Sequence, residues 1–171
     1  MGIRDSDMDV QLILTSDMAK LNGEAKLAAD DAVKAGLKID SPSQVQWALP
    51  EMGVGNTVVI DALLGTGLES DVTEPYSNLI RQANDSGLPV LAIDVPSGLN
   101  ASTGAIHGCA IKAHATITMI AYKQGLFTGL GPVVCGEISL AQLNLPQQAR
   151  DAQTCIATLE SWNERQNEAR F

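Results

Sequence analysis

The chain has 171 residues, a formal net charge of −9 and three cysteines. This length suits one domain that closes its core without disulfides, and the acidic charge excludes general binding to a nucleic-acid backbone. The cysteines lack the spacing of a zinc site, the longest apolar stretches fall far short of the roughly 18 residues of a membrane span, and the polar N-terminus offers no secretory signal, which together predict a cytoplasmic protein.

The first fifty residues predict one strand and two helices. Residues 10–15 form a short apolar run that is typical of a buried strand. Residues 18–35 place apolar side chains at helical spacing until a glycine ends the pattern. A brief helix over residues 45–49, which Ser41 or Ser43 could cap, is also expected. It ends before Pro50 because a proline disfavours helical geometry in the residue that precedes it.

The middle of the chain predicts a strand followed by a helix. Gly53 and Gly55 mark a turn, after which residues 57–62 form a β-branched apolar run. Such a run is typical of a strand that is buried on both faces of a parallel sheet. The next helix is expected to begin with Thr73 as its N-cap and to end at Gly87.

Strands dominate the rest of the predicted domain. Residues 88–93 and 115–121 read as two further buried strands, and residues 137–143 as an edge strand or a peripheral hairpin. Alternating strands and helices predict an α/β fold with a parallel, doubly wound sheet. We expect this domain to occupy residues 1–145, and the polar residues 146–171 to be a tail or an interdomain linker.

Two of these strands share one pattern, in which an apolar run delivers a carboxylate into a glycine-rich loop. Asp61 precedes Gly65-Thr-Gly67, and Asp94 precedes Pro-Ser97-Gly. Parallel sheets bind ligands at the carboxyl ends of their strands, and neighbouring strands lie about 4.8 Å apart, so both carboxylates are expected to face one pocket. The alternative is that each aspartate only caps its own turn.

Two carboxylates held close together repel, so that one must take up a proton or a cation must sit between them. The Ser97 hydroxyl and loop carbonyls would complete a cage of hard oxygen ligands, which selects an alkali or alkaline-earth cation over zinc. Lys123 follows the third buried strand and could meet a phosphate or a catalytic aspartate, although a solvated surface lysine fits equally well. His107 and His114 are too isolated for a metal or triad site.

Three ordered motifs carry a family resemblance. Val-Val-Ile-Asp-Ala-Leu-Leu-Gly-Thr-Gly-Leu at residues 58–68, Ala-Ile-Asp-Val-Pro-Ser-Gly-Leu at 92–99 and Lys-Gln-Gly-Leu-Phe-Thr-Gly at 123–129 closely resemble the YjeF N-terminal domain family. Residues 20–25 extend the likeness, which covers roughly residues 10–145. The resemblance implies a Rossmann-like, three-layer α/β/α fold and NAD(P)HX epimerase activity, which interconverts the R and S forms of hydrated NADH and NADPH in nicotinamide cofactor repair.

The resemblance also implies roles for individual residues. Asp61 and Ser97 would coordinate a potassium ion, Asp94 would act as the acid/base, and Lys123 would steady that carboxylate or a phosphate. The implied contacts with the hydrated dinucleotide are made by Gly65, Thr66, Gly67, Leu68, Glu69, Ser70, Asp71 and Asp94.

The chain departs from the family pattern at its start. An Asn-Asn-Gly-Gly-Asp-Gly loop and its helix, expected before the first strand, are absent, and backbone N–H groups at such a loop supply much of the anion binding. The polar end resembles the linker that leads into an ADP-dependent dehydratase domain in fused bacterial relatives. We therefore expect a fragment of a bifunctional enzyme that binds NAD(P)HX and that could form a homo-oligomer. The alternative is a non-catalytic scaffold module or an inactive fragment.

Overall fold

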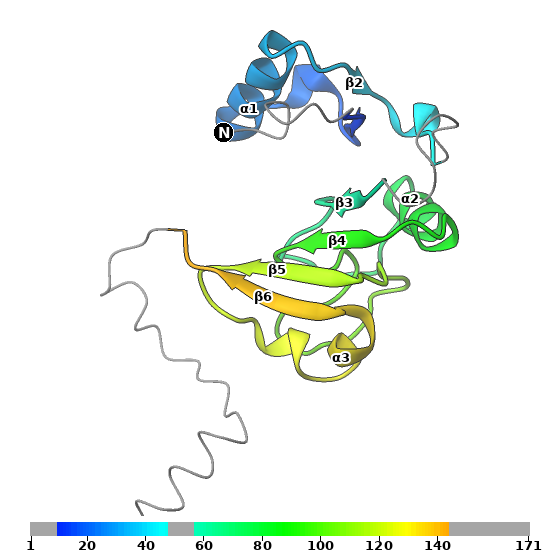
Figure 1. Ribbon diagram of the computed structural model, residues 1–171, viewed down its shortest axis with the longest axis vertical. Coiled ribbons are helices and arrows are strands. Elements are labelled where there is room, and N and C mark those ends of the chain that lie inside the picture. Colours follow the sequence, from blue (N-terminus) through cyan, green and yellow to red (C-terminus); the bar gives the residue numbers. More distant parts are fainter. Residues whose placement is uncertain (1–9, 48–56, 144–171) are drawn as a thin grey trace, which may run out of the picture.

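A computed structural model describes residues 10–47 and 57–143, and all of the described strands run parallel to their neighbours. Figure 1 shows two sheets, one of two strands in the part drawn from blue to cyan and one of four strands. The turn expected at Gly53 and Gly55, the end of the brief helix at residues 48 and 49, and the polar tail from residue 146 lie outside the described residues.

The larger sheet contains four strands in the order of the sequence: β3 (Val59–Asp61), β4 (Val90–Ile93), β5 (Ala115–Met119) and β6 (Glu137–Ala141). Each strand pairs in parallel with the next, so a connection must return the chain to the start of the sheet every time. This arrangement confirms the predicted α/β fold with a mostly parallel sheet. It also makes β6 an edge strand, rather than part of a hairpin.

The first part of the chain is more broken than its sequence pattern predicts. β1 (Leu12–Ile13) pairs with β2 (Ile39–Asp40), a strand too short to give a recognisable period. The single helix expected over residues 18–35 is divided into a 3-10 turn, η2 (Met18–Lys20), and helix α1 (Gly23–Lys34). The division falls at two residues with extended backbone, which break the run of helical hydrogen bonds.

The brief helix lies earlier than expected. It is a 3-10 turn, η3 (Pro42–Gln44), with Ser41 as its N-cap, and Val45 already has non-helical geometry. The Ser41 backbone N–H donates to Gln44 Oε1 at 2.9 Å, which is half of a capping box. Proline at the first helical position therefore fixes where this turn begins. The predicted helix at residues 45–49 was placed too late, because the turn has already ended at Gln44.

Helix α2 (Tyr76–Asp85) packs against the four-stranded sheet next to β4. Its buried residues Ile80 and Ala83 pack with Val90 and Ile111 in one core cluster. The helix begins later than predicted, because Thr73 contributes only its carbonyl oxygen, which accepts a hydrogen bond from Ser77 N at 3.0 Å. Two short elements, η5 (Gln124–Leu126) and α3 (Gly131–Val134), were not predicted and build a second cluster that includes Leu126, Val134 and Cys135.

Strand β3 contradicts the prediction that it is buried on both faces. Ile60 is 44% exposed and Val58, just before the strand, is 52% exposed, whereas Asp61 is buried. β3 is an edge of the four-stranded sheet, and Val59, on the opposite side of the strand from Ile60, is the residue that packs against the core cluster under α2.

Within the described ranges, no helix is long and apolar enough to cross a bilayer.

Candidate functional site

The carboxyl edge of the four-stranded sheet positions both aspartates. Asp61 is the last residue of β3 and pairs in register with Ala92 on β4, two residues before Asp94. A chain that leaves parallel strands at the same edge places the residues after them on neighbouring loops. The sequence expectation that both carboxylates lie at this edge therefore agrees with the register of β3 and β4.

Asp61 is bound to Ser97, which lies on the loop after β4. The Ser97 hydroxyl donates to Asp61 Oδ1 at 2.6 Å, and the Ser97 backbone N–H donates to Oδ2 at 2.8 Å. Leu63 N–H adds a longer bond to Oδ1 at 3.3 Å. Asp61 is only 3% exposed, so its carboxylate is enclosed and both oxygen atoms are occupied. The couple joins the ends of two neighbouring strands.

Burial raises the pKa of Asp61, although the hydrogen bonds from Ser97 and Leu63 oppose that rise. Across residues 10–47 and 57–143, no lysine, arginine or histidine forms an ion pair with Asp61. The nearby atoms that could act as metal ligands are oxygen atoms: the Ser97 hydroxyl, and the Leu64 carbonyl oxygen, which lies 3.4 Å from that hydroxyl. A buried, uncompensated carboxylate among hard oxygen donors suits an alkali or alkaline-earth cation.

Asp94 has a different environment, one strand away. Its backbone adopts the left-handed region with φ of 72°, and its N–H donates to Ile117 O at 2.8 Å. Oδ1 accepts hydrogen bonds from Met119 N at 2.9 Å, from Thr118 Oγ1 at 3.3 Å and from Lys123 Nζ. In the part of the chain that the structure describes, no hydrogen bond uses Oδ2. One oxygen is therefore fixed, and the other is left for a ligand.

Lys123 forms an ion pair with Asp94 instead of extending into solvent. Its Nζ also donates to Met119 O at 2.7 Å, and its side chain is 20% exposed. Burial raises the pKa of Asp94, but the hydrogen bonds from Lys123 and Met119, together with the charge of Lys123, outweigh it and leave the pKa lowered. The carboxylate is thus ionised at neutral pH, which makes it a proton acceptor.

The structure brings the predicted site residues together in two couples, Asp61 with Ser97 and Asp94 with Lys123. No hydrogen bond among the described residues joins one couple to the other, although Ser97 follows Asp94 by only three positions. The turn-capping alternative holds in part for Asp61, which accepts from Leu63 N. Asp94 does not cap its own turn, because its carboxylate binds the end of β5.

The loop Gly65–Asp71 is exposed except at Leu68, which is half-buried. A Cβ atom at Gly65 or Gly67 would meet nothing within 4 Å, so the backbone there is open to a ligand. Gly98 differs, because a Cβ atom would collide with the backbone of Cys109. That glycine is required by packing between two loops.

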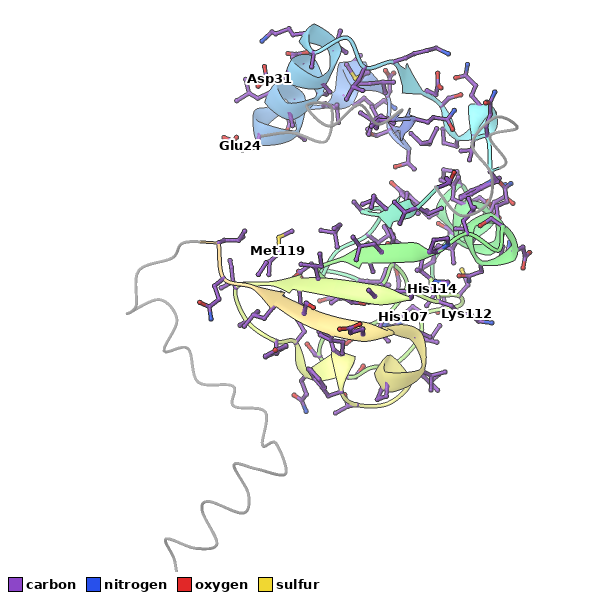
Figure 2. The ribbon with its side chains drawn as sticks, in the orientation of Figure 1. Glu24, Asp31, His107, Lys112, His114 and Met119 are labelled. Carbon is purple, nitrogen blue, oxygen red and sulfur yellow. The ribbon has the colours of Figure 1, made fainter. Side chains whose placement is uncertain are left out.

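Three polar residues that contact Asp94 or approach the loop Gly65–Asp71 were not assigned to the site from the sequence, and His107 had been set aside. Thr118 contacts Asp94, Asn100 donates to Leu68 O at 3.2 Å, and His107 Nδ1 lies 3.8 Å from Asp71 Oδ1. Figure 2 labels His107 and His114; His114 Nδ1 accepts a hydrogen bond from Val90 N at 3.1 Å, which is a structural contact. The only available signal was at Asn100, since an asparagine in a segment such as Asn-Ala-Ser-Thr-Gly favours an Asx turn.

Other metal chemistry is not apparent in residues 10–47 and 57–143, where no group of three or more His, Cys, Asp or Glu side chains could hold a metal ion. Cys135 is buried and burial raises its pKa to about 11, so this thiol is protonated at neutral pH. The oxygen donors around Asp61 are the remaining candidate for an ion.

Comparisons with known proteins agree on one family. The family described as "YjeF-related protein N-terminus" matches residues 3–125. The bifunctional NAD(P)H-hydrate repair enzyme Nnr of Coxiella burnetii is 38% identical over 143 residues, which cover 84% of this chain and 28% of the relative. The NAD(P)H-hydrate epimerase of Levilactobacillus brevis is 41% identical over 97 residues, covering 57% of this chain and 45% of the relative.

A solved structure shares the fold. The crystal structure of yeast ynu0, YNL200c, matches with a TM-score of 0.59 at 14% identity, over 79% of this chain and 56% of that one. The chain spans less than half the length of the two bacterial relatives.

Proposed function

Because the chain belongs to the family of YjeF-related protein N-termini, we propose that it carries NAD(P)H-hydrate epimerase chemistry, which interconverts the R and S forms of hydrated NADH and NADPH. The observation that supports this most strongly is the couple of Asp94 and Lys123 at the carboxyl edge of the sheet. It holds a proton acceptor and a proton donor in contact, with one carboxylate oxygen free.

The reaction needs one proton donated and one accepted. The substrate carries a hydroxyl group at C6 of the nicotinamide ring, and the N1 lone pair can expel it as water once the hydroxyl is protonated. Lys123 is the source of that proton, since the lowered pKa of Asp94 leaves the carboxylate ionised. When water returns to the other face of the ring, Asp94 Oδ2 accepts its proton. Exchange with solvent then removes the proton from Asp94 and returns one to Lys123, which restores both groups.

This division of roles refines the expectation that Asp94 acts as both acid and base. Thr118 and the backbone N–H of Met119 hold Oδ1, so the carboxylate cannot rotate freely and Oδ2 keeps a fixed direction. A fixed proton acceptor within reach of the substrate is worth about 10²–10⁴ in rate. We place the hydrated dinucleotide against Asp94 and the loop Gly65–Asp71, whose glycines are open.

We further propose that Asp61 and Ser97 hold a potassium ion. The buried carboxylate without a cationic partner among the described residues supports this, as do the hard oxygen donors around it. The ion would supply the positive charge that the enclosed carboxylate lacks. Asp61 and Ser97 themselves link the end of β3 to the loop after Asp94, so their hydrogen bonds orient the loop from which the catalytic carboxylate projects.

The relatives also support proposals about the whole protein. We propose that residues 1–145 form the epimerase domain and that residues 146–171 lead into a dehydratase domain, as the bifunctional name of the Coxiella relative suggests. A cytoplasmic location, and self-association into a homo-oligomer, belong to the same proposal. The protein would then repair both epimers of a damaged cofactor by supplying the form that the second activity consumes.

The direct test follows the conversion of purified (R)-NADHX to the S form by chromatography. The wild-type chain should exceed the spontaneous rate, and Asp94→Asn should abolish the excess because the amide cannot accept the proton. Asp85→Asn, at the exposed end of α2, is the matched control and should leave the rate unchanged. A rate for Asp94→Asn equal to that of the wild type would refute the role of this carboxylate.

A further inference from the structure

The second half of the loop Gly65–Asp71 is attached to the segment that follows Ser97. Asn100 Nδ2 donates to Leu68 O at 3.2 Å, and Val72 N donates to His107 O at 3.1 Å. The backbone of His107 is itself fixed, because its N–H donates to Gly98 O at 3.0 Å. The loop proposed to bind substrate is therefore held at two points by the connection that leaves the catalytic strand β4.

The orientation of the Asn100 amide is determined by its neighbours. Oδ1 accepts hydrogen bonds from Ser102 N at 3.0 Å and from Thr103 N at 2.9 Å. The reverse orientation would point the NH2 group at two N–H donors, so the amino group must face Leu68 and His107. Both hydrogen atoms of the amino group then have an acceptor, the Leu68 carbonyl and the imidazole ring.

This orientation in turn determines the tautomer of His107. Asn100 Nδ2 lies 3.3 Å from His107 Nε2, which must accept, so the ring proton sits on Nδ1 and points toward Asp71 Oδ1 at 3.8 Å. The ring thus lies between Asn100 and Asp71, the last residue of the loop. Among the described residues, Asp71 is the charged group that contacts His107.

We propose that Asn100 and His107 are positioning residues that clasp the loop Gly65–Asp71 in the geometry that binds the hydrated dinucleotide. This inference rests on the proposed function. Neither side chain needs to touch the reacting ring: Figure 2 shows Met119, whose N–H binds Asp94, at one end of β5 and His107 nearer the other. The clasp acts on the loop through the Leu68 carbonyl oxygen and the Asp71 side chain, and its loss should weaken substrate binding more than turnover.

The test compares three variants by steady-state kinetics on NADHX. Asn100→Ala removes all four contacts. Asn100→Asp keeps the acceptor for Ser102 and Thr103, replaces the donor to Leu68 and His107 with an acceptor oxygen, and adds a negative charge. Both should raise KM about tenfold with kcat within about twofold, since two hydrogen bonds that order the loop are lost. Asn84→Ala is the matched control, because Asn84 also makes two backbone hydrogen bonds, to Ala110 and Lys112, and should keep the wild-type KM.

Hydrogen exchange of a peptide covering residues 65–72 tests the clasp without substrate. Asn100→Asp should speed exchange there several-fold and leave the sheet unchanged. If the wild type epimerises and both Asn100 variants keep its KM, the clasp is refuted and the proposed function stands. If the wild type does not epimerise, the proposed function fails, and the positioning role for that substrate fails with it. In the exchange experiment, an unchanged rate for residues 65–72 in Asn100→Asp would refute the clasp itself.

Discussion

Asp61 and Asp94 occupy equivalent places in the sequence, each at the end of an apolar strand and before a glycine-containing loop, yet their environments are opposite. Asp61 is enclosed, both of its oxygen atoms are bound, and burial raises its pKa. Asp94 is partly exposed and one of its oxygen atoms has no hydrogen bond among the described residues; contact with Lys123 and Met119 lowers its pKa despite burial.

The difference comes from what the next strand supplies. The loop after β4 places Ser97 beside Asp61, and a serine offers neutral donors only. The end of β5 places Lys123 and a backbone N–H beside Asp94, and a lysine adds a positive charge. The pKa of a carboxylate at a strand end is thus decided by the residues of the neighbouring loop, and similar local motifs can give carboxylates with opposite pKa shifts.

Removing the positive charge of Lys123 should give Asp94 a raised pKa like that of Asp61. The accompanying loss of activity is the largest effect that we expect. In Lys123→Gln, kcat should fall by about 10²–10⁴ because the proton donor is lost. The pKa of Asp94 should rise, since burial is then opposed by fewer hydrogen bonds and no nearby charge. The residual activity should therefore be lost at a higher pH than in the wild type as the solution is acidified. An unshifted acid limb in the pH–rate profile would contradict the coupling.

Deleting each carboxylate should lower the free energy of unfolding by different amounts. Asp61→Ala leaves the buried Ser97 N–H and hydroxyl and the Leu63 N–H without their acceptor, and should lower the free energy of unfolding by about 3 kcal/mol. Asp94→Ala, at a more open position, should cost about 1 kcal/mol or less. Urea denaturation of both variants measures the two values. Equal losses would show that the two sites do not differ as described.

Potassium should stabilise the chain through the site of Asp61 and Ser97, and not through Asp94. At an ion concentration ten times its Kd, a single bound ion adds about 1.4 kcal/mol to the free energy of unfolding. Thermal unfolding in potassium chloride, compared with tetramethylammonium chloride at the same ionic strength, measures this gain. Asp61→Ala should abolish it, and Asp94→Ala should retain it. A similar gain in both variants would mean that the ion acts elsewhere or only by screening.

The smallest expected effect concerns Thr118, which donates to Asp94 Oδ1 at 3.3 Å and to Ala121 O at 3.4 Å. Both distances are long for a hydroxyl donor, so each bond is weak. Thr118→Val, which keeps the shape of this buried side chain, should change kcat by no more than about threefold and the free energy of unfolding by less than about 1 kcal/mol. A larger loss would assign Thr118 a direct part in catalysis.

The fold could be predicted where the apolar pattern was long. The strands at β4 and β5 and the core stripe of α2 follow directly from runs of buried residues. The two residues of β2 and the four of α3 are too short to give a period, and η5 forms where the chain turns after Lys123. β3 was placed correctly, but its exposure was not, because edge position is a property of the sheet and not of the strand.

The site could be predicted as a set of residues but not as a set of contacts. Strand ends and glycine loops identified Asp61, Asp94, Ser97 and Lys123, and the register of the sheet brings them to one edge. Their division into two couples depends on which loop reaches which carboxylate, and no spacing encodes that. Asn100 and His107 were missed for the same reason, since their contacts with the loop Gly65–Asp71 arise between segments more than thirty positions apart.

The most direct test of the central claim is a carboxyl-carbon NMR titration of Asp61 and Asp94 in one potassium-free sample, with the signals assigned from Asp61→Asn and Asp94→Asn. We predict that Asp61 takes up its proton first as the pH falls, above the ordinary aspartate value of 3.8, while Asp94 is still ionised below it. The order of titration is informative even if the chain unfolds in acid before Asp94 is titrated. The two carboxyls titrating together, or Asp94 titrating first, would contradict the account.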